Sequence, residues 1–202
     1  MNSIKFIYFD VGGVILTDTG LKDLCLETGV DFNVCNNTFS KYGHQACQGK
    51  YTFNQLWEFS LNKLQISSEI VDIVPKIVSY AKPILETHQL ILDLKDKFPL
   101  GLLTNIPKDF PTPERQPGLF PDHKFDVVIR SADIGMAKPD LEMYLYSQHQ
   151  VKLRPEEIFF TDDSFNNIQA AKKIGWQTFH FDRNNPKQSV TSIRKLFDLS
   201  NN

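Results

Sequence analysis

Residues 4–13 read IKFIYFDVGG, an apolar run that meets an acidic residue and then a pair of glycines. The run Ile4–Phe9 has the length of a buried strand, and Asp10 follows it directly. Gly12 and Gly13 let the backbone turn tightly and bring its amides close to a bound anion. This stretch therefore predicts a strand that ends in a polar, turn-forming segment.

Two later apolar runs end in the same way. Leu100–Leu103 is followed by Thr104, and Ile158–Thr161 is followed by Asp162 and Asp163. In open parallel α/β sheets the ligand crevice lies beyond the carboxyl ends of the strands, so we expect these polar side chains to converge. An acid, a hydroxyl and an acidic pair would then meet at one edge of the sheet.

Alternating strand and helix patterns in the rest of the chain predict the fold class. The expected class is α/β, a doubly wound (Rossmann-like) parallel sheet core with a small α-helical cap inserted after the first strand. Two more strands are expected at Asp126–Arg130 and Gln177–Phe181. Helices of the core are expected at Pro83–Phe98, Pro139–Gln150 and Asn166–Ile174.

The segment between the first two expected strands carries helical patterns. Apolar residues at three-to-four spacing, separated by turn or capping residues, predict helices at Leu21–Glu27, Phe32–Cys47, Phe53–Lys63 and Ser67–Tyr80. We therefore expect a core domain of residues 1–18 and 82–202 and a helical cap of residues 19–81. Prolines between residues 106 and 123 exclude regular helix and predict an ordered loop beside Thr104.

Composition limits the partners that the protein can have. The 202-residue chain is 41% hydrophobic and 23% charged, which is ordinary for a soluble globular protein. Its 22 basic and 24 acidic residues give no field that would attract nucleic acid or an anionic membrane, and no apolar run approaches membrane-spanning length. The expected partner is a small molecule, and the oligomeric state is left open. Because the N-terminus has no signal-peptide pattern and the cysteines have no CxxC spacing, we expect a cytoplasmic protein with reduced thiols at Cys25, Cys35 and Cys47.

Each polar residue of the predicted site has an ordinary structural explanation beside the chemical one. Asp10 stands at a strand end beside backbone amides that could approach an anion, but Asp-x-Gly-Gly is also good turn chemistry. The carboxylates of Asp162 and Asp163 repel each other unless a cation such as Mg²⁺ compensates, yet Asp163 also suits the start of a helix. Lys138 precedes Pro139, which suits the first position of a helix, where the dipole favours an anion; a solvated surface lysine is the alternative. Only the combination favours a functional site.

Four short segments together resemble the haloacid dehalogenase superfamily, in its phosphatase branch with a small helical cap. They are residues 9–14, 103–105, 136–139 and 161–164, which read FDVGGV, LTN, MAKP and TDDS. The resemblance spans residues 4 to about 181 and implies magnesium-dependent hydrolysis of a small phosphorylated metabolite through an aspartyl-phosphate intermediate. Within the superfamily, the chain looks similar to sugar-phosphate phosphatases and to the phosphatase domain of soluble epoxide hydrolase.

The resemblance also implies a role for each motif residue. Asp10 would be the catalytic nucleophile. The catalytic hydroxyl that contacts the phosphoryl group would be that of Thr104, and Lys138 would be the catalytic lysine that bridges nucleophile and phosphate. Backbone groups that would bind the phosphoryl group belong to Gly12, Gly13 and Asn105. The oxygens that would hold Mg²⁺ are the carboxylates of Asp10, Asp162 and Asp163 and the backbone carbonyl of Gly12.

Gly12 is the position where the chain departs from the family pattern. Phosphatases of the superfamily usually carry a second aspartate there, which protonates the leaving group and later activates water. Glycine keeps the carbonyl that would contact Mg²⁺ but removes this acid, and Asp18 is the nearest carboxylate in the sequence. Two alternatives to an active phosphatase follow: a weak or inactive phosphate-binding or regulatory relative, and a metal-independent 2-haloacid dehalogenase that uses the same aspartate.

Overall fold

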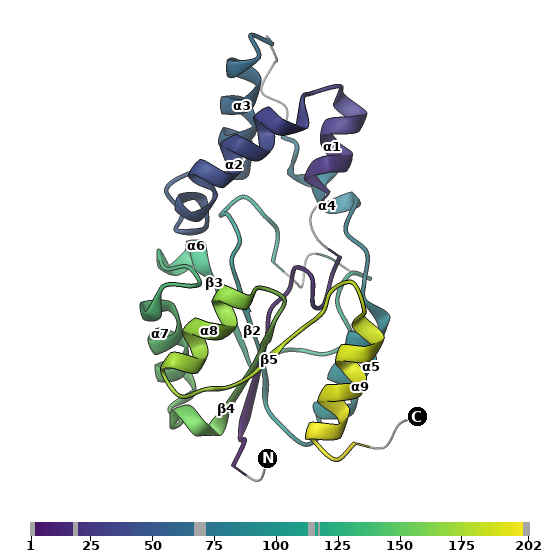
Figure 1. Cartoon of the computed structure of the whole chain (residues 1–202), viewed down its shortest axis with the longest axis vertical. Helices are drawn as coiled ribbons and strands as arrows, with labels where there is room; N and C mark the ends of the chain where they lie inside the picture. The colour runs from purple at the N-terminus through teal and green to yellow at the C-terminus, as the bar shows by residue number, and fades with distance from the viewer. Residues whose placement is uncertain (1–2, 18–19, 67–71, 113–115, 117, 200–202) are drawn as a thin grey trace.

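The computed structural model describes residues 3–17, 20–66, 72–112, 116 and 118–199. Its centre is a sheet of five parallel strands in the order β3-β2-β1-β4-β5 (Figure 1). The strands are β1 Phe6–Phe9, β2 Leu100–Thr104, β3 Val127–Arg130, β4 Ile158–Asp162 and β5 Gln177–His180. All five predicted strands are present, and the predicted doubly wound α/β class is confirmed.

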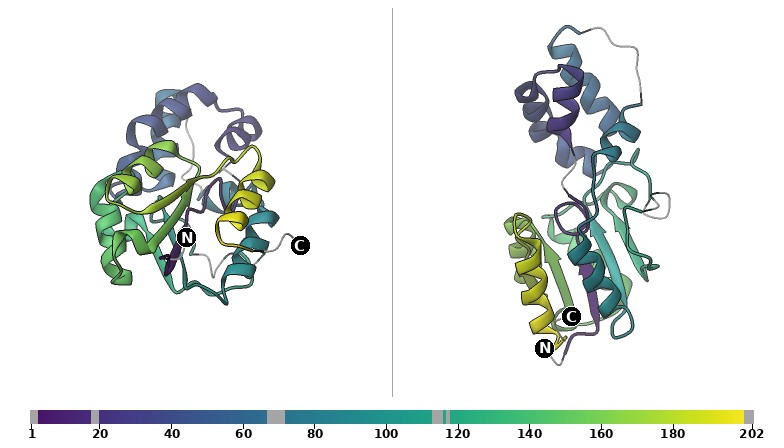
Figure 2. Two further views of the ribbon diagram at one scale, coloured as in Figure 1. Left: turned by 60° about the horizontal axis from the view of Figure 1, so that its bottom comes forward. Right: turned by 90° about the vertical axis from the view of Figure 1, so that its right-hand side faces the viewer.

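Two helical layers cover the sheet, one on each face. Helices α5 (Leu85–Leu94) and α9 (Pro186–Leu196) lie on one side, and α7 (Leu141–Val151) and α8 (Phe165–Lys173) lie on the other (Figure 1 and Figure 2). Successive residues of a strand point to opposite faces. Side chains of β1 accordingly alternate between two separate hydrophobic clusters, one under each helical layer. Burial on both faces explains why the central strands read as continuous apolar runs.

Four further helices form a layer beyond the carboxyl ends of the strands (Figure 1). They are α1 Leu21–Thr28, α2 Phe32–Cys47, α3 Phe53–Lys63 and α4 Val74–Ser79, and they share a hydrophobic cluster of their own. This layer occupies the position predicted for the cap, and we refer to α1–α4 as the cap helices. The domain boundaries stay predictions, because residues 18 and 19 lie outside the described residues.

The predicted helix Ser67–Tyr80 is interrupted at Asp72 and Ile73, which are not helical. Residues 67–71 lie outside the described part of the chain, and the helix begins only at Val74, with Pro75 in its first turn. Proline is favoured there because its missing N–H needs no partner in the first turn. The carboxylate of Asp72 accepts the backbone N–H of Val74 at 3.1 Å, which completes the start of the helix.

The loop that follows β2 fastens the cap helices to the core. Its Asp109 carboxylate accepts the backbone N–H groups of Phe53 at 2.9 Å and Asn54 at 3.0 Å, at the start of α3. A carboxylate at a helix N-terminus satisfies unpaired donors and opposes the helix dipole. The ring of Phe110 joins the hydrophobic cluster of the cap. Described residues of the predicted proline-rich loop contain neither helix nor strand.

Three short or terminal elements were not predicted. They are the single-turn helix α6 (Ser131–Ile134), the 3₁₀ turn η2 (Pro155–Glu157) and α9. The start of α9 does carry a sequence signal, because asparagine is favoured as an N-cap and proline in the first turn of a helix. Asn185 accepts the Gln188 N–H at 3.3 Å, and Pro186 lies in the first turn.

Among the described residues, no helix is both long enough and apolar enough to cross a bilayer.

Candidate active site

The carboxyl ends of the three central strands bring the predicted site residues together. Asp10 directly follows β1, while Thr104 and Asp162 are the last residues of the flanking strands β2 and β4. The backbone N–H of Asp10 donates to Thr161 O at 3.0 Å, which extends the β1–β4 pairing by one residue. The two halves of the sheet meet at β1, with β2 and β3 on one side and β4 and β5 on the other, and open α/β sheets place their ligand crevice at such a point.

Lys138 lies at the centre of this group and is 2% exposed. Its Nζ forms an ion pair with Asp10 Oδ1 at 2.8 Å and donates to Asp162 Oδ2 at 2.7 Å and to the carbonyl of Leu103 at 2.8 Å. Burial acts to lower the pKa of Lys138, but the two carboxylates outweigh it and raise the pKa above its usual value. The side chain is therefore a positive charge fixed by two hydrogen bonds and by the ion pair with Asp10.

The predicted position of Lys138 at the start of a helix is wrong. Helix α7 begins at Leu141, and its N-cap residue is Asp140. Pro139 therefore lies ahead of the helix. The lysine instead belongs to the preceding loop, from which its ammonium reaches the two carboxylates directly.

Asn105 holds this loop in place through a pair of hydrogen bonds. Its Nδ2 donates to Lys138 O at 2.7 Å, and the backbone N–H of Lys138 donates to Asn105 Oδ1 at 2.8 Å. The prediction for Asn105 concerned its backbone amide, whereas the structure reveals this second function of its side chain. The amide thereby fixes the point from which the Lys138 side chain extends.

Asp162 is fully buried and fixed by several donors. Besides Lys138, its carboxylate accepts the Ser164 N–H at 2.7 Å and the Asn167 amide at 3.0 Å from each oxygen. Sequence reasoning missed Asn167, although one signal was available: it is a polar residue on the buried face of α8, beside Ile168 and Ala171. Such a buried amide requires partners nearby.

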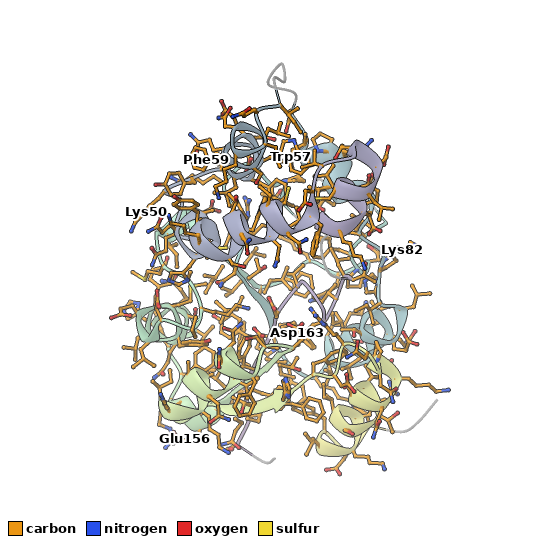
Figure 3. The ribbon with its side chains drawn as sticks, turned by 45° about the horizontal axis from the view of Figure 1, so that its top comes forward. Lys50, Trp57, Phe59, Lys82, Glu156 and Asp163 are labelled. Carbon is orange, nitrogen blue, oxygen red and sulfur yellow. The ribbon has the colours of Figure 1, made fainter. Side chains whose placement is uncertain are left out.

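Asp163 lies between the sheet and the cap helices, where Figure 3 labels it. Its Oδ2 is 3.3 Å from Arg183 Nη1, and its backbone carbonyl bonds to the ring of His180 at 2.9 Å. Gly13 permits this placement, because a Cβ at Gly13 would lie 2.5 Å from Asp163 Oδ2. Gly13 also has a φ of +76°, a conformation that glycine adopts most easily.

The three aspartates form a group that suits a hard cation. Asp10, Asp162 and Asp163 each offer an oxygen within 4.8 Å of the others. Burial and the neighbouring charge of Asp162 raise the pKa of Asp10 to about 7, against the opposing effect of Lys138. Lys138 and Arg183 bring two positive charges to three carboxylates, and oxygen-rich acidic sites of this kind fit Mg²⁺. The donor set therefore fits the metal that the sequence predicts.

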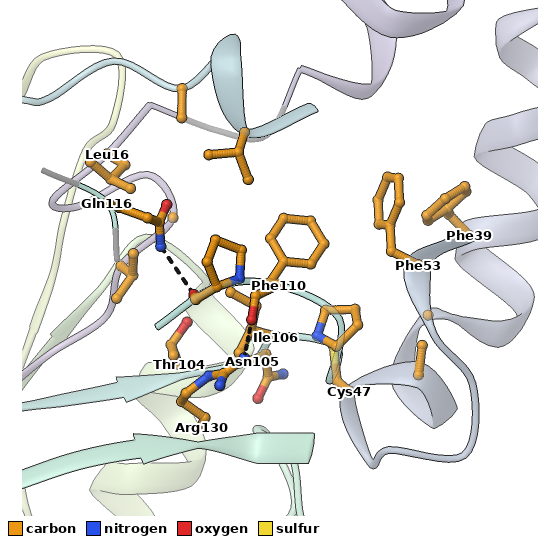
Figure 4. Close-up of a pocket in the computed structure, with 18 of the residues that line it drawn as sticks. Leu16, Phe39, Cys47, Phe53, Thr104, Asn105, Ile106, Phe110, Gln116 and Arg130 are labelled. Atoms are coloured by element: carbon orange, nitrogen blue, oxygen red, sulfur yellow. Dashed lines mark hydrogen bonds between the residues drawn. The ribbon is translucent and has the colours of Figure 1, made fainter. Parts of the chain in front are cut away.

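A cavity of about 260 Å³ adjoins this group. Its lining includes Gly12, together with Thr104 and Asn105, which Figure 4 labels, so these three predicted residues face one space. A Cβ built on Gly12 has no neighbouring atom within 4 Å, so the position usually held by an acid is open. The candidate surrogate acid Asp18 lies outside the described residues.

Cys47 also lines the cavity and was not among the predicted site residues. Burial raises the pKa of its thiol to about 11. The thiol therefore stays protonated near neutral pH, where it is a poor nucleophile. Its position at the end of α2 makes it part of the cavity wall.

Comparison with known proteins identifies the family. Residues 4–175 match the haloacid dehalogenase-like hydrolases, and the chain belongs to that family. A sesquiterpene phosphatase of Aspergillus oryzae is 29% identical over 190 residues, 88% of this chain and 90% of the relative. A phosphoglycolate phosphatase of Escherichia coli is 38% identical over 77 residues, 38% of this chain and 30% of the relative. A bifunctional epoxide hydrolase of Rattus norvegicus is 35% identical over 54 residues, 27% of this chain and 10% of the relative.

Solved structures share the fold at lower identity. A HAD-like hydrolase from Porphyromonas gingivalis superposes with a TM-score of 0.76 at 19% identity, covering 98% of this chain and 100% of its own. A HAD family enzyme from Bacteroides thetaiotaomicron, solved with magnesium and inorganic phosphate, superposes with a TM-score of 0.63 at 22% identity. The match covers 89% of this chain and 95% of the enzyme. An L-2-haloacid dehalogenase from Xanthobacter autotrophicus superposes with a TM-score of 0.66 at 18% identity. The match covers 87% of this chain and 76% of the dehalogenase. These likenesses concern the fold, which serves both reaction classes.

Proposed function

We propose that the protein is a magnesium-dependent hydrolase of small phosphomonoesters in which Asp10 is the nucleophile. The observation that carries this proposal is the geometry around Lys138, whose Nζ lies 2.8 Å from Asp10 and 2.7 Å from Asp162. Asp163 completes an acidic group at the same sheet edge. Such an arrangement combines a fixed nucleophile with charges that neutralise a phosphoryl group.

The reaction takes place in two steps. An oxygen of Asp10 forms a bond to phosphorus while the bond from phosphorus to the leaving oxygen breaks, which gives an aspartyl-phosphate. Water then attacks phosphorus, releases inorganic phosphate and restores the Asp10 carboxylate. The leaving oxygen takes its proton from solvent, because Gly12 supplies no acid.

The other site residues bind and orient. Lys138 stabilises the charge that builds on the phosphoryl oxygens, and the Thr104 hydroxyl donates to one of them. Backbone groups of Gly12, Gly13 and Asn105 complete the phosphoryl site. Asp10, Asp162, Asp163 and the Gly12 carbonyl would hold Mg²⁺, which would supply Lewis-acid neutralisation of the phosphoryl charge. Asp162 also keeps Lys138 in position.

The acidic group favours a phosphatase over the dehalogenase alternative. Displacement of halide by a carboxylate requires no dication. Without a cation, the three clustered carboxylates would repel one another and make the buried site energetically unfavourable. The relative that aligns with 88% of this chain is a phosphatase by name, which also favours a phosphatase over a dehalogenase. A same-fold enzyme solved with magnesium and inorganic phosphate agrees with the proposed cofactor.

The direct test is hydrolysis of 4-nitrophenyl phosphate with and without Mg²⁺, together with chloride release from 2-chloropropionate. We expect phosphate release that EDTA abolishes and added Mg²⁺ restores. Asp163→Asn should raise the Mg²⁺ concentration needed, because a neutral amide is a poorer ligand for a hard dication. EDTA-resistant chloride release without phosphatase activity would establish the dehalogenase instead, and inactivity in both assays would support the inactive relative.

A further inference from the structure

The cavity beside the catalytic residues is almost entirely apolar. It meets the phosphoryl site at Gly12 and Thr104, so a phosphoryl group at Asp10 would direct the rest of the substrate into this space. The other walls come from α2, α3, α4 and the loop after β2. Thirteen of the residues that line the cavity are aliphatic or aromatic, among them Leu16, Ala46, Leu56, Val78, Ile106 and Phe120.

Three of these rings form a continuous aromatic wall. Phe53 has its ring centroid 4.8 Å from that of Phe39 and 5.3 Å from that of Phe110. Phe39 and Phe53 belong to the cap helices, whereas Phe110 belongs to the loop that follows β2. The wall therefore includes residues of both the cap helices and the core (Figure 4).

Several polar side chains at the cavity already bond to the protein, although Arg130 Nε is buried without a partner among the described residues. The Thr17 hydroxyl accepts the backbone N–H of Lys82 at 2.9 Å. Gln116 Nε2 and Arg130 Nη2 donate to backbone carbonyls of the loop at residues 106–112, at 3.1 Å and 2.6 Å. The Asn105 amide is held by the loop that carries the catalytic lysine. A sugar would bring several hydroxyls that need partners, and leaving them unpaired in an apolar space is costly.

We propose that the organic group of the substrate is apolar, so that the enzyme acts on aryl or alkyl phosphates in preference to sugar phosphates. This inference rests on the proposed function, since it assigns the group attached to the transferred phosphoryl. A cavity of about 150 Å³ lined by similar side chains holds benzene, so the larger space here takes a substituted ring or a branched chain. The driving force is burial of apolar surface.

Binding measured without turnover tests the inference separately from the proposed function. Asp10→Asn protein with Mg²⁺ is titrated with phenyl, 4-ethylphenyl and 4-butylphenyl phosphate, whose phosphoryl groups are alike. Each buried methylene is worth up to about fourfold in affinity, so 4-butylphenyl phosphate should bind at least tenfold more tightly than phenyl phosphate. Glucose 6-phosphate should bind more weakly than phenyl phosphate. The heat capacity of binding should become more negative as the chain lengthens.

Gly43→Leu provides a variant that fills the cavity without a clash. Gly43 lines the cavity on α2, and a Cβ built there has no neighbouring atom within 4 Å. Leucine also favours a helix more than glycine does, so the fold should persist. The variant should reduce the affinity ratio of 4-butylphenyl to phenyl phosphate at least tenfold. Asn37→Leu is the matched control, because it adds the same side chain at an exposed position of α2 outside the cavity and should leave the ratio unchanged.

The two hypotheses fail in different ways. An affinity that does not rise with chain length, or glucose 6-phosphate binding as tightly as 4-butylphenyl phosphate, overturns the apolar substrate class even if the native enzyme hydrolyses all these esters. A ratio unaffected by Gly43→Leu also overturns it. Chain-length dependence without hydrolysis of any ester by the native protein would instead support the apolar site and refute the phosphatase.

Discussion

The side-chain amide of Asn105 pairs with both backbone polar groups of Lys138. Nδ2 of Asn105 donates to Lys138 O at 2.7 Å, and Lys138 N–H donates to Asn105 Oδ1 at 2.8 Å. Asn105 follows β2, whereas Lys138 lies in the loop before α7, so the pairing joins two of the four motif segments. It fixes the backbone from which the ammonium reaches Asp10, and this makes Asn105 a positioning residue.

Asn105→Ala should therefore lower kcat for an aryl phosphate roughly hundredfold, because small displacements of a catalytic group have effects of that size. Leaving two backbone groups unpaired should also cost about 1 to 3 kcal/mol of stability. Kinetics are measured where thermal melting shows the variant folded. Asn166→Ala, at an exposed position of α8, is the matched control. Undiminished kcat in folded Asn105→Ala would remove the positioning role.

Gly13→Ala should destabilise the protein more than Gly29→Ala does. Both glycines have positive φ, +76° and +70°, so alanine costs roughly 1–2 kcal/mol of backbone strain at each. Only at Gly13 would the new Cβ collide with Asp163, since a Cβ at Gly29 has open space. Urea denaturation should give an additional loss of about 1–3 kcal/mol at Gly13. Mg²⁺ affinity should fall only in Gly13→Ala; equal effects of the two variants would contradict the contact.

Gly12→Asp should improve hydrolysis of esters with poor leaving groups. The position faces open space, so a carboxyl group fits there, and general acid catalysis typically contributes about 10²- to 10⁴-fold. The native enzyme should show a steep dependence of rate on the pKa of the leaving group. This dependence should become shallower in the variant. A flat dependence in the native enzyme would mean that another acid is present, and its loss in Asp18→Asn would identify that acid.

Asp10→Asn should stabilise the metal-free protein at alkaline pH. The pKa of Asp10 is raised in the folded protein from 3.8 to about 7, chiefly by burial and then by Asp162. Between these two values the folded protein binds more protons than the unfolded chain, so its stability falls as the pH rises from about 4 to about 7. Each unit of pKa difference corresponds to about 1.4 kcal/mol, which gives an upper limit of about 4 kcal/mol.

Urea denaturation in EDTA at pH 5 and pH 8 measures this effect. The stability advantage of Asp10→Asn over the native protein should be roughly 1 to 3 kcal/mol greater at pH 8 than at pH 5. Added Mg²⁺ should stabilise the native protein more at pH 8, because the proton no longer competes for the carboxylate. An advantage that is the same at both pH values would show that the pKa of Asp10 is not raised.

The strands and the convergence of their ends could be predicted because buried parallel strands need continuous apolar runs. Asp10, Thr104 and Asp162 stand directly after or at the end of such runs, so their common edge follows from the sheet order. The position of Lys138 relative to α7 could not be predicted. Pro139 suggested a helix start, but the cap is Asp140, and the lysine is instead held by partners distant in sequence.

Interactions between distant segments account for the rest. The Asn105 side chain bonds to a residue 33 positions away, and no local pattern announces such a pairing. The apolar character of the cavity likewise arises only when three cap helices and the loop after β2 assemble around it. Single apolar residues such as Leu56 and Val78 read equally well as core residues of their helices.

Trapping the covalent intermediate tests the assigned mechanism most directly. Native protein and Asp10→Asn are mixed with Mg²⁺ and an aryl phosphate labelled in its phosphoryl group, quenched in acid within one turnover, digested and mapped by mass spectrometry. We predict that the label is found on Asp10 of the native protein and that Asp10→Asn carries no label and releases no phosphate. Label on another residue, or undiminished phosphate release by Asp10→Asn, would contradict the mechanism.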